Sequence, residues 1–126
     1  MSRVIAIANQ KGGVGKTTTA INLGASLAIA EKRTLVIDCD PQGNASSGLG
    51  IARETGAPDV YDCLVDGQAV EDALRPAIHF PMLDVVPASR DLAGAEVELI
   101  ERPRRERILR EIIEPIRDRY DYILID

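Results

Sequence analysis

Short runs of apolar residues recur along the chain and alternate with longer polar or amphipathic stretches. Their length and their content of Val, Ile and Leu are typical of strands. The runs predict four strands, at residues 3–8, 33–40, 82–89 and 120–126. The first of these is predicted to be buried, and the third is stopped by Pro87. Runs that are apolar throughout favour a parallel sheet covered on both faces.

Amphipathic patterns between these strands predict helices at 16–31, 91–101 and 103–120, the last opened by Pro103 near its first turn. The pattern is weak between 51 and 80 and predicts two short helices, around 60–66 and 69–75. The Gly-, Ser- and Asn-rich stretch 41–50 has no periodicity and predicts a loop. Strands that alternate with helices indicate an α/β fold, an open parallel sheet with flanking helices.

Composition narrows the class of protein. The 126 residues are 45% hydrophobic but only 3% aromatic, so aliphatic side chains must build the core. The net charge of −5 gives no general attraction to nucleic acid. Two isolated cysteines and no long apolar run predict a reduced, cytoplasmic protein. The alternating charges of 101–111 predict a solvent-exposed helix face, with its buried positions at Ile108, Leu109, Ile112 and Ile113.

The stretch NQKGGVGKTTTAIN, at 9–22, has the composition of a phosphate-binding loop. Glycines let backbone N–H groups converge on an anion, and the following helix adds its positive N-terminus. Lys16 would contact the outer phosphates, and the Thr17 hydroxyl would bind Mg²⁺. The usual pattern GxxxxGK[ST] requires glycine where this chain has Gln10, and it does not ask for Lys11. The predicted nucleotide-binding residues are Lys11, Gly12, Gly13, Val14, Gly15, Lys16, Thr17 and Thr18.

The string KGGVGKTT resembles the deviant Walker A motif of the ParA/MinD family of ATPases, a class of P-loop NTPase. The resemblance implies ATP and Mg²⁺ as cofactors. It also implies that Lys11 reaches the nucleotide of a second subunit in a homodimer that encloses two ATP molecules. The alternative is that Lys11 is an ordinary exposed charge in a loop.

Two further motifs resemble this family. VIDCDPQGNASSGLG, at 36–50, resembles the second motif of partition ATPases, which implies that Asp40 activates the attacking water and that Asp38 is structural. YDYILID, at 120–126, resembles Walker B and implies that Asp126 holds Mg²⁺ through a water. The predicted catalytic residues are Lys11, Lys16 and Asp40, and the predicted metal ligands are Thr17, Asp40 and Asp126. Alternatively, Asp38 and Asp40 merely cap the turn that follows their strand.

As a whole, the chain resembles ParA/Soj-type chromosome or plasmid partitioning ATPases. We expect residues 1–126 to be the N-terminal part of a single P-loop ATPase domain whose C-terminal half is missing. The resemblance implies non-specific DNA binding through that half, a ParB-like centromere-binding partner, a nucleoid-associated location and no membrane binding. A MinD-like or orphan ParA-like ATPase that positions a membrane or protein cargo is the alternative. A binding module that does not hydrolyse nucleotide is another.

Overall fold

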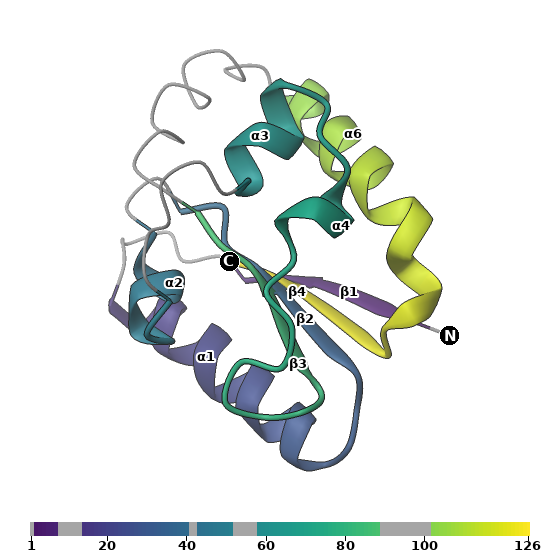
Figure 1. The fold of residues 1–126 in the computed structure, drawn as a ribbon. Helices are drawn as coiled ribbons and strands as arrows, with labels where there is room; N and C mark the ends of the chain where they lie inside the picture. Colours follow the sequence, from purple (N-terminus) through teal and green to yellow (C-terminus); the bar gives the residue numbers. More distant parts are fainter. Residues whose placement is uncertain (1, 8–13, 41–42, 52–57, 89–101) are drawn as a thin grey trace.

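A computed structural model describes residues 2–7, 14–40, 43–51, 58–88 and 102–126, without the side chains of 14–17 and 102–106. Figure 1 gives the course of the chain through its helices and strands. In chain order these are β1 (Arg3–Ala6), α1 (Val14–Ile29), β2 (Thr34–Ile37), α2 (Asn44–Gly48), α3 (Val60–Val65), α4 (Val70–Ala73), β3 (Leu83–Val86), α6 (Arg102–Ile113), the 3₁₀ helix η1 (Glu114–Arg119) and β4 (Tyr122–Ile125).

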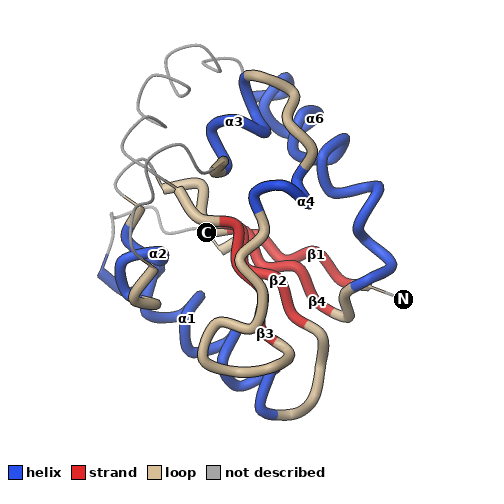
Figure 2. The backbone as a smooth tube through the Cα atoms, in the orientation of Figure 1, coloured by secondary structure: helices blue, strands red, loops and turns tan. Residues whose placement is uncertain are grey.

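The four strands form one parallel sheet in the order β1-β4-β2-β3, with helices on both faces (Figure 2). Residues that alternate along a strand reach opposite faces. Leu35 and Ile37 therefore pack with α3, α4 and α6, whereas Val36 packs with α1. The predicted α/β architecture, with an open parallel sheet between helical layers, is confirmed.

Strand β1 differs from the prediction of a buried strand. All four residues of β2 are buried, but Arg3, Val4 and Ala6 in β1 are exposed, Val4 by 40%. The reason lies in the strand order, since within the described residues β1 pairs with β4 alone, whereas β2 has a strand on each side. The sequence of β1 is as apolar as that of a central strand, so its position could not be predicted from the apolar pattern.

Two helical segments also differ from the predictions. Residues 44–48, expected to be part of a loop, form helix α2. The helix expected over 103–120 ends at Ile113 and continues as η1, because Pro115 has no N–H group to donate to the preceding turn. The short helices α3 and α4 and strand β3 confirm the predictions for their segments. The helix predicted at 91–101 lies outside the described residues.

Helix α1 packs unusually closely against the sheet at Gly24. A Cβ atom on this residue would lie 3.0 Å from Cγ2 of Val36, which is closer than ordinary van der Waals contact. The C-terminus of α1 is joined to the start of β2 by residues 30–33, so the helix runs antiparallel to the strand. Its N-terminus therefore lies toward the carboxyl end of the sheet.

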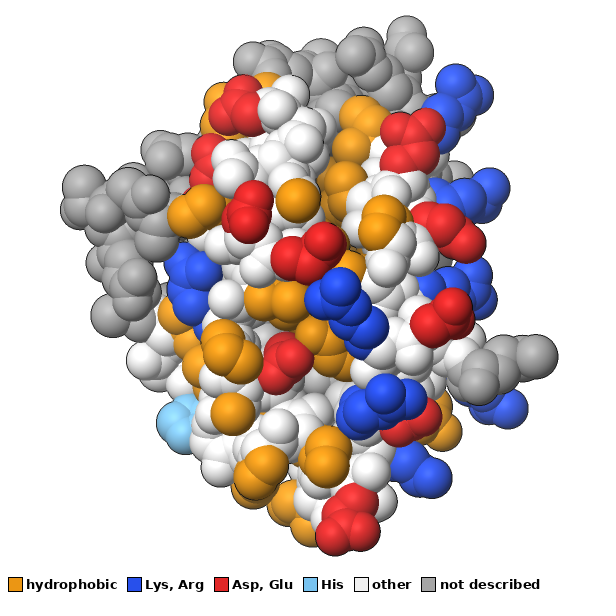
Figure 3. Space-filling model, turned by 45° about the vertical axis from the view of Figure 1, so that its right-hand side comes forward, with side chains coloured by type: hydrophobic (Ala, Val, Ile, Leu, Met, Phe, Trp, Pro, Cys, Tyr) orange, Lys and Arg blue, Asp and Glu red, His pale blue; other side chains and the backbone are white. Residues whose placement is uncertain are grey.

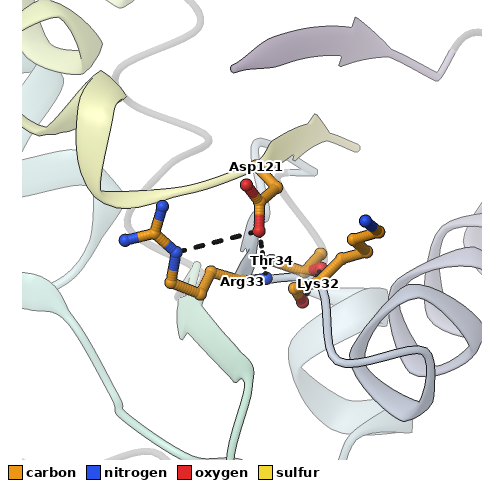
Figure 4. Close-up of polar contacts among 4 residues, drawn as sticks. All are labelled: Lys32, Arg33, Thr34 and Asp121. Carbon is orange, nitrogen blue, oxygen red and sulfur yellow. Dashed lines mark hydrogen bonds and ion pairs between the residues drawn. The ribbon is translucent and has the colours of Figure 1, made fainter. Parts of the chain in front are cut away.

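At the amino end of the sheet, Asp121 connects β2 with β4 (Figure 4). Its carboxylate accepts a hydrogen bond from the backbone N–H of Arg33 at 2.9 Å and lies 3.7 Å from Nε of the same residue. The backbone N–H of Asp121 donates to the Arg33 carbonyl in return, at 2.7 Å. The hydrogen bond from the Arg33 N–H is the main cause that lowers the pKa of Asp121. This contact fixes the strand register at the end opposite the predicted nucleotide site.

Charged side chains of both signs are mixed on the face of the molecule drawn in Figure 3. In Figure 3, Lys and Arg are interleaved with Asp and Glu and do not form one large basic patch. Ile113 is buried, and Ile108, Leu109 and Ile112 pack on the same core, as expected for an otherwise solvent-exposed helix. None of the helices in the described part of the chain has the length and apolar character to cross a membrane.

Cys63 is a buried residue of α3, and its thiol gives a first testable prediction. Burial, followed by the charges of Asp62 and other nearby acids, raises its pKa to about 12. Thiolate is the reactive form, so we expect the folded protein to be alkylated at Cys63 at least about 100-fold more slowly than the unfolded protein at pH 8. Timed iodoacetamide labelling with and without urea, read by peptide mass spectrometry, measures this ratio. Equal rates in both solvents would contradict the prediction.

Candidate functional site

The carboxyl ends of three parallel strands meet at one end of the sheet. Backbone hydrogen bonds continue beyond the strands themselves, from Ile7 N–H to the Ile125 carbonyl at 2.8 Å and from Asp126 N–H to the Ile37 carbonyl at 2.9 Å. The N–H of Cys39 then donates to the Asp126 carbonyl at 2.8 Å. These bonds bring Asp38 and Asp126 together next to the end of β1. Ligand sites of open α/β sheets lie at this end of the strands.

The carboxylate of Asp38 is completely buried, and three donors contact it. Its Oδ1 accepts from the Asp40 N–H at 3.0 Å, and its Oδ2 accepts from both the N–H and the hydroxyl of Ser46, at 2.9 and 2.7 Å. Burial raises the pKa of Asp38, the hydrogen bonds from Ser46 and Asp40 oppose this, and the negative charge of Asp126 raises it further. This environment agrees with the structural role that the resemblance implied for Asp38.

Asp40 is partly buried and lies two residues further along the chain. Its Oδ2 accepts a hydrogen bond from the Asn44 N–H at 3.1 Å, and its carbonyl accepts from the Gly43 N–H at 2.9 Å. Gly43 has φ +65°, a conformation that glycine adopts without steric cost. The carboxylate is therefore fixed at the start of α2, at the carboxyl end of the sheet, in a residue that is only partly buried.

The predicted phosphate-binding loop is described only in part. Lys11, Gly12 and Gly13 lie outside the described residues. Val14, Gly15, Lys16 and Thr17 form the first turn of α1, so the helix begins two residues earlier than the sequence predicted, and their side chains are not described. Thr18 is exposed. The structure brings the N-terminus of α1 and the aspartates to the same end of the sheet.

The carboxylates at this end of the sheet fit a magnesium ion whose coordination shell is completed by other ligands. No group of three or more His, Cys, Asp or Glu side chains that could hold a metal occurs within the described residues. Magnesium commonly takes one or two carboxylates and completes its shell with phosphate oxygens and waters. Asp126, 5% exposed at the carboxyl end of the sheet, offers a carboxylate of the type that such a site requires.

Sequence reasoning missed Ser46, a residue that is 4% exposed and whose hydroxyl makes two hydrogen bonds. Seven residues lie between Asp38 and Ser46, and the sequence predicted a loop from residue 41 onward, so no local pattern links the two. The absence of proline from 44–48 was the signal that a short helix was possible there. Among the described residues near this site, Cys39 is buried.

Comparisons with known proteins agree with the fold and the motifs. A family model described as an AAA domain matches residues 2–126. The chain is 53% identical over 126 residues to the chromosome partitioning protein ParA of Myxococcus xanthus, covering 100% of this chain and 44% of that protein. It is equally identical, 53% over 126 residues, to the sporulation initiation inhibitor protein Soj of Bacillus subtilis, covering 100% and 49%. The chain thus spans about half the length of the curated relatives it matches.

Solved structures give the same result. Cobyrinic acid a,c-diamide synthase from Mycobacterium smegmatis, with bound ADP and magnesium, has a TM-score of 0.87 and 37% identity, covering 100% of this chain and 51% of that one. McdA of Cyanothece in complex with ATP has a TM-score of 0.89 and 30% identity, covering 99% and 47%. The cell division ATPase MinD of Pyrococcus furiosus has a TM-score of 0.76 and 30% identity, covering 100% and 50%. These likenesses confirm the predicted fold class and the resemblance to ParA/Soj and MinD proteins.

Proposed function

The chain belongs to the AAA domain family, and from this premise we propose that it is the N-terminal part of an ATPase that segregates a chromosome or plasmid. The observation that carries the proposal is its 53% identity, over all 126 residues, to ParA and Soj proteins. The arrangement of Asp38, Asp40 and Asp126 at the carboxyl end of the sheet supports a nucleotide site there. The remainder of the ATPase domain would follow Asp126.

The proposed substrate is ATP with Mg²⁺. The glycines of 12–15 would leave room for phosphate oxygens beside backbone N–H groups, at the positive N-terminus of α1. Lys16 would contact the outer phosphates, and Thr17 and Asp126 would hold the magnesium ion. When bound, the ion would neutralise negative charge on the phosphates. The ADP-magnesium and ATP complexes of the two structural relatives support this assignment.

Hydrolysis would depend on Asp40 and on a second subunit. Asp40 is only partly buried and its carboxylate lies in a fixed loop, as an acceptor for the proton of an attacking water requires. Lys11 would act in the partner subunit of an ATP-bound homodimer and would stabilise charge that develops on the partner's phosphates. This arrangement would make turnover depend on dimerisation.

The DNA and the regulatory partner follow from the same resemblance. A ParB-like centromere-binding protein would stimulate hydrolysis, and non-specific DNA would bind through the C-terminal half, in the nucleoid. On the face drawn in Figure 3 the charges are mixed and form no basic patch for DNA, which is compatible with a DNA contact elsewhere in the protein. The structural likeness to the cell division ATPase MinD supports a second candidate, an ATPase that positions cargo at a membrane.

DNA binding by the full-length protein tests the proposal. We expect random-sequence duplex to bind with ATP and not with ADP. If the protein contacts about six phosphates, its affinity should fall roughly 10³-fold between 50 and 200 mM salt. Fluorescence anisotropy with a labelled duplex measures both effects. Failure to bind DNA with either nucleotide would contradict the proposal, and ATP-dependent binding to anionic lipid vesicles would then favour the MinD-like candidate.

A further inference from the structure

The hydroxyl of Ser46 connects two parts of the chain that are far apart in sequence. It donates to Oδ2 of Asp38 at 2.7 Å and accepts a hydrogen bond from the backbone N–H of Ala88 at 3.0 Å. Asp38 follows β2, and Ala88 lies just beyond β3, the strand that pairs with β2. We name this pair of hydrogen bonds the Ser46 bridge. Because Ser46 is only 4% exposed, water cannot readily replace its hydroxyl.

The same carboxylate stabilises the start of α2. Gly43, the residue before this helix, has no side chain that could cap it, and Asp38 accepts the Ser46 N–H from across the loop instead. Helix N-termini leave such N–H groups without a partner inside the helix. Asp38 is itself fixed by its own N–H, which donates to the Val86 carbonyl at 3.0 Å. The loop is thereby attached to the sheet at its base.

The bridge reaches Asp40 through the other oxygen of Asp38. Oδ1 of Asp38 accepts the Asp40 N–H at 3.0 Å, so rotation of the Asp38 carboxylate would shift the backbone at Asp40. The loop also approaches the same segment closely at Gly43, since a Cβ atom on this residue would lie 3.0 Å from the Ala88 carbonyl oxygen. The position of Asp40 therefore depends on a chain of contacts that ends at Ala88.

We propose that Ser46 is a positioning residue for ATP hydrolysis, which it supports by orienting Asp38 and, through it, the backbone of Asp40. The inference rests on the proposed ATPase function and on the role of Asp40 in it. Only a side chain that both donates and accepts can form the bridge. Threonine retains this capacity, whereas alanine leaves the Ala88 N–H and one position on Asp38 without a partner. The hydroxyl of Ser46 bonds to Asp38 and Ala88, neither of which is a predicted phosphate-binding residue, so its effect should fall on kcat.

The test compares Ser46→Ala, Ser46→Thr and Ser47→Ala in the full-length protein. Ser47 is the exposed neighbour in the same helix and is the matched control. We expect Ser46→Ala to lower kcat roughly 10- to 100-fold, as a misplaced catalytic group does, with ATP affinity within about threefold of wild type. Ser46→Thr should recover kcat to within about threefold, and Ser47→Ala should not change it. Ser46→Cys, which keeps the size but weakens the hydrogen bonds, covers the case in which Ser46→Ala does not fold.

Amide hydrogen exchange separates the bridge from the reaction. In Ser46→Ala or Ser46→Cys, the amides of Asp40 and Ala88 should exchange at least about tenfold faster, and amides in the centre of β2 should not change. If the wild-type protein hydrolyses ATP and Ser46→Ala has the same kcat, the positioning role is overturned and the ATPase proposal stays intact. Absence of turnover in the wild-type protein would instead overturn the ATPase proposal and, with it, the role of Ser46. Unchanged exchange at Asp40 would overturn the proposed route through Asp38.

Discussion

Lys16→Ala is expected to remove most of the affinity of the full-length protein for ATP. An ammonium group on the outer phosphates makes a charge-assisted contact, and loss of one partner of such a contact costs about 2 kcal/mol or more. The dissociation constant should therefore rise at least about 30-fold. Titration with a fluorescent ATP analogue measures it. Unchanged affinity and turnover would contradict the proposal of a phosphate-binding loop at 12–18.

The chain offers two matched controls, because its other lysines are Lys11 and Lys32. Lys32 is exposed at the amino end of the sheet, near the Arg33–Asp121 contact, so Lys32→Ala should bind ATP as wild type does. Lys11→Ala should also retain ATP binding, but should lose the ATP-bound dimer and its hydrolysis. Analytical ultracentrifugation with ATP separates these outcomes. Equal losses of affinity in Lys11→Ala and Lys16→Ala would mean that both lysines serve the same nucleotide.

The fold could be predicted from the sequence where one local pattern decides the structure. The apolar runs of β2, β3 and β4 and the amphipathic stretch of α1 were sufficient, because burial on both faces or on one face leaves a direct trace in residue order. Exposure of β1 was not predictable from its residues. It follows from which strands lie beside it, and strand order is a property of the whole sheet.

The candidate site was predictable in its residue types and not in its connections. The string KGGVGKTT predicts a phosphate site by its chemistry, and the family resemblance adds the two aspartates after β2 to that prediction. The contact of Ser46 with Asp38 and Ala88 joins residues 8 and 42 positions apart, so it exists only in the folded chain. Helix α2 was missed for a related reason, since its first N–H groups are capped by Asp38 and Asp40 and not by the residue before it.

Asp40→Ala should lower the turnover of the full-length protein about 10²- to 10⁴-fold, the usual effect of removing a general base. Binding of ATP should persist, so the ATP-bound dimer should accumulate. A phosphate-release assay measures turnover, and sedimentation with ATP measures the amount of dimer. A variant that stays monomeric with ATP would argue against the water-activating role of Asp40.

Asp40→Asn distinguishes the base from the cap. The carboxylate accepts the Asn44 N–H at 3.1 Å, and the amide oxygen of asparagine can accept the same hydrogen bond while it is a far weaker base. If Asp40 acts on the attacking water, Asp40→Asn should be as slow as Asp40→Ala, although its loop is intact. If Asp40 only caps α2, Asp40→Asn should turn over ATP as wild type does and Asp40→Ala alone should be impaired. The two variants together therefore separate chemistry from loop structure at one position.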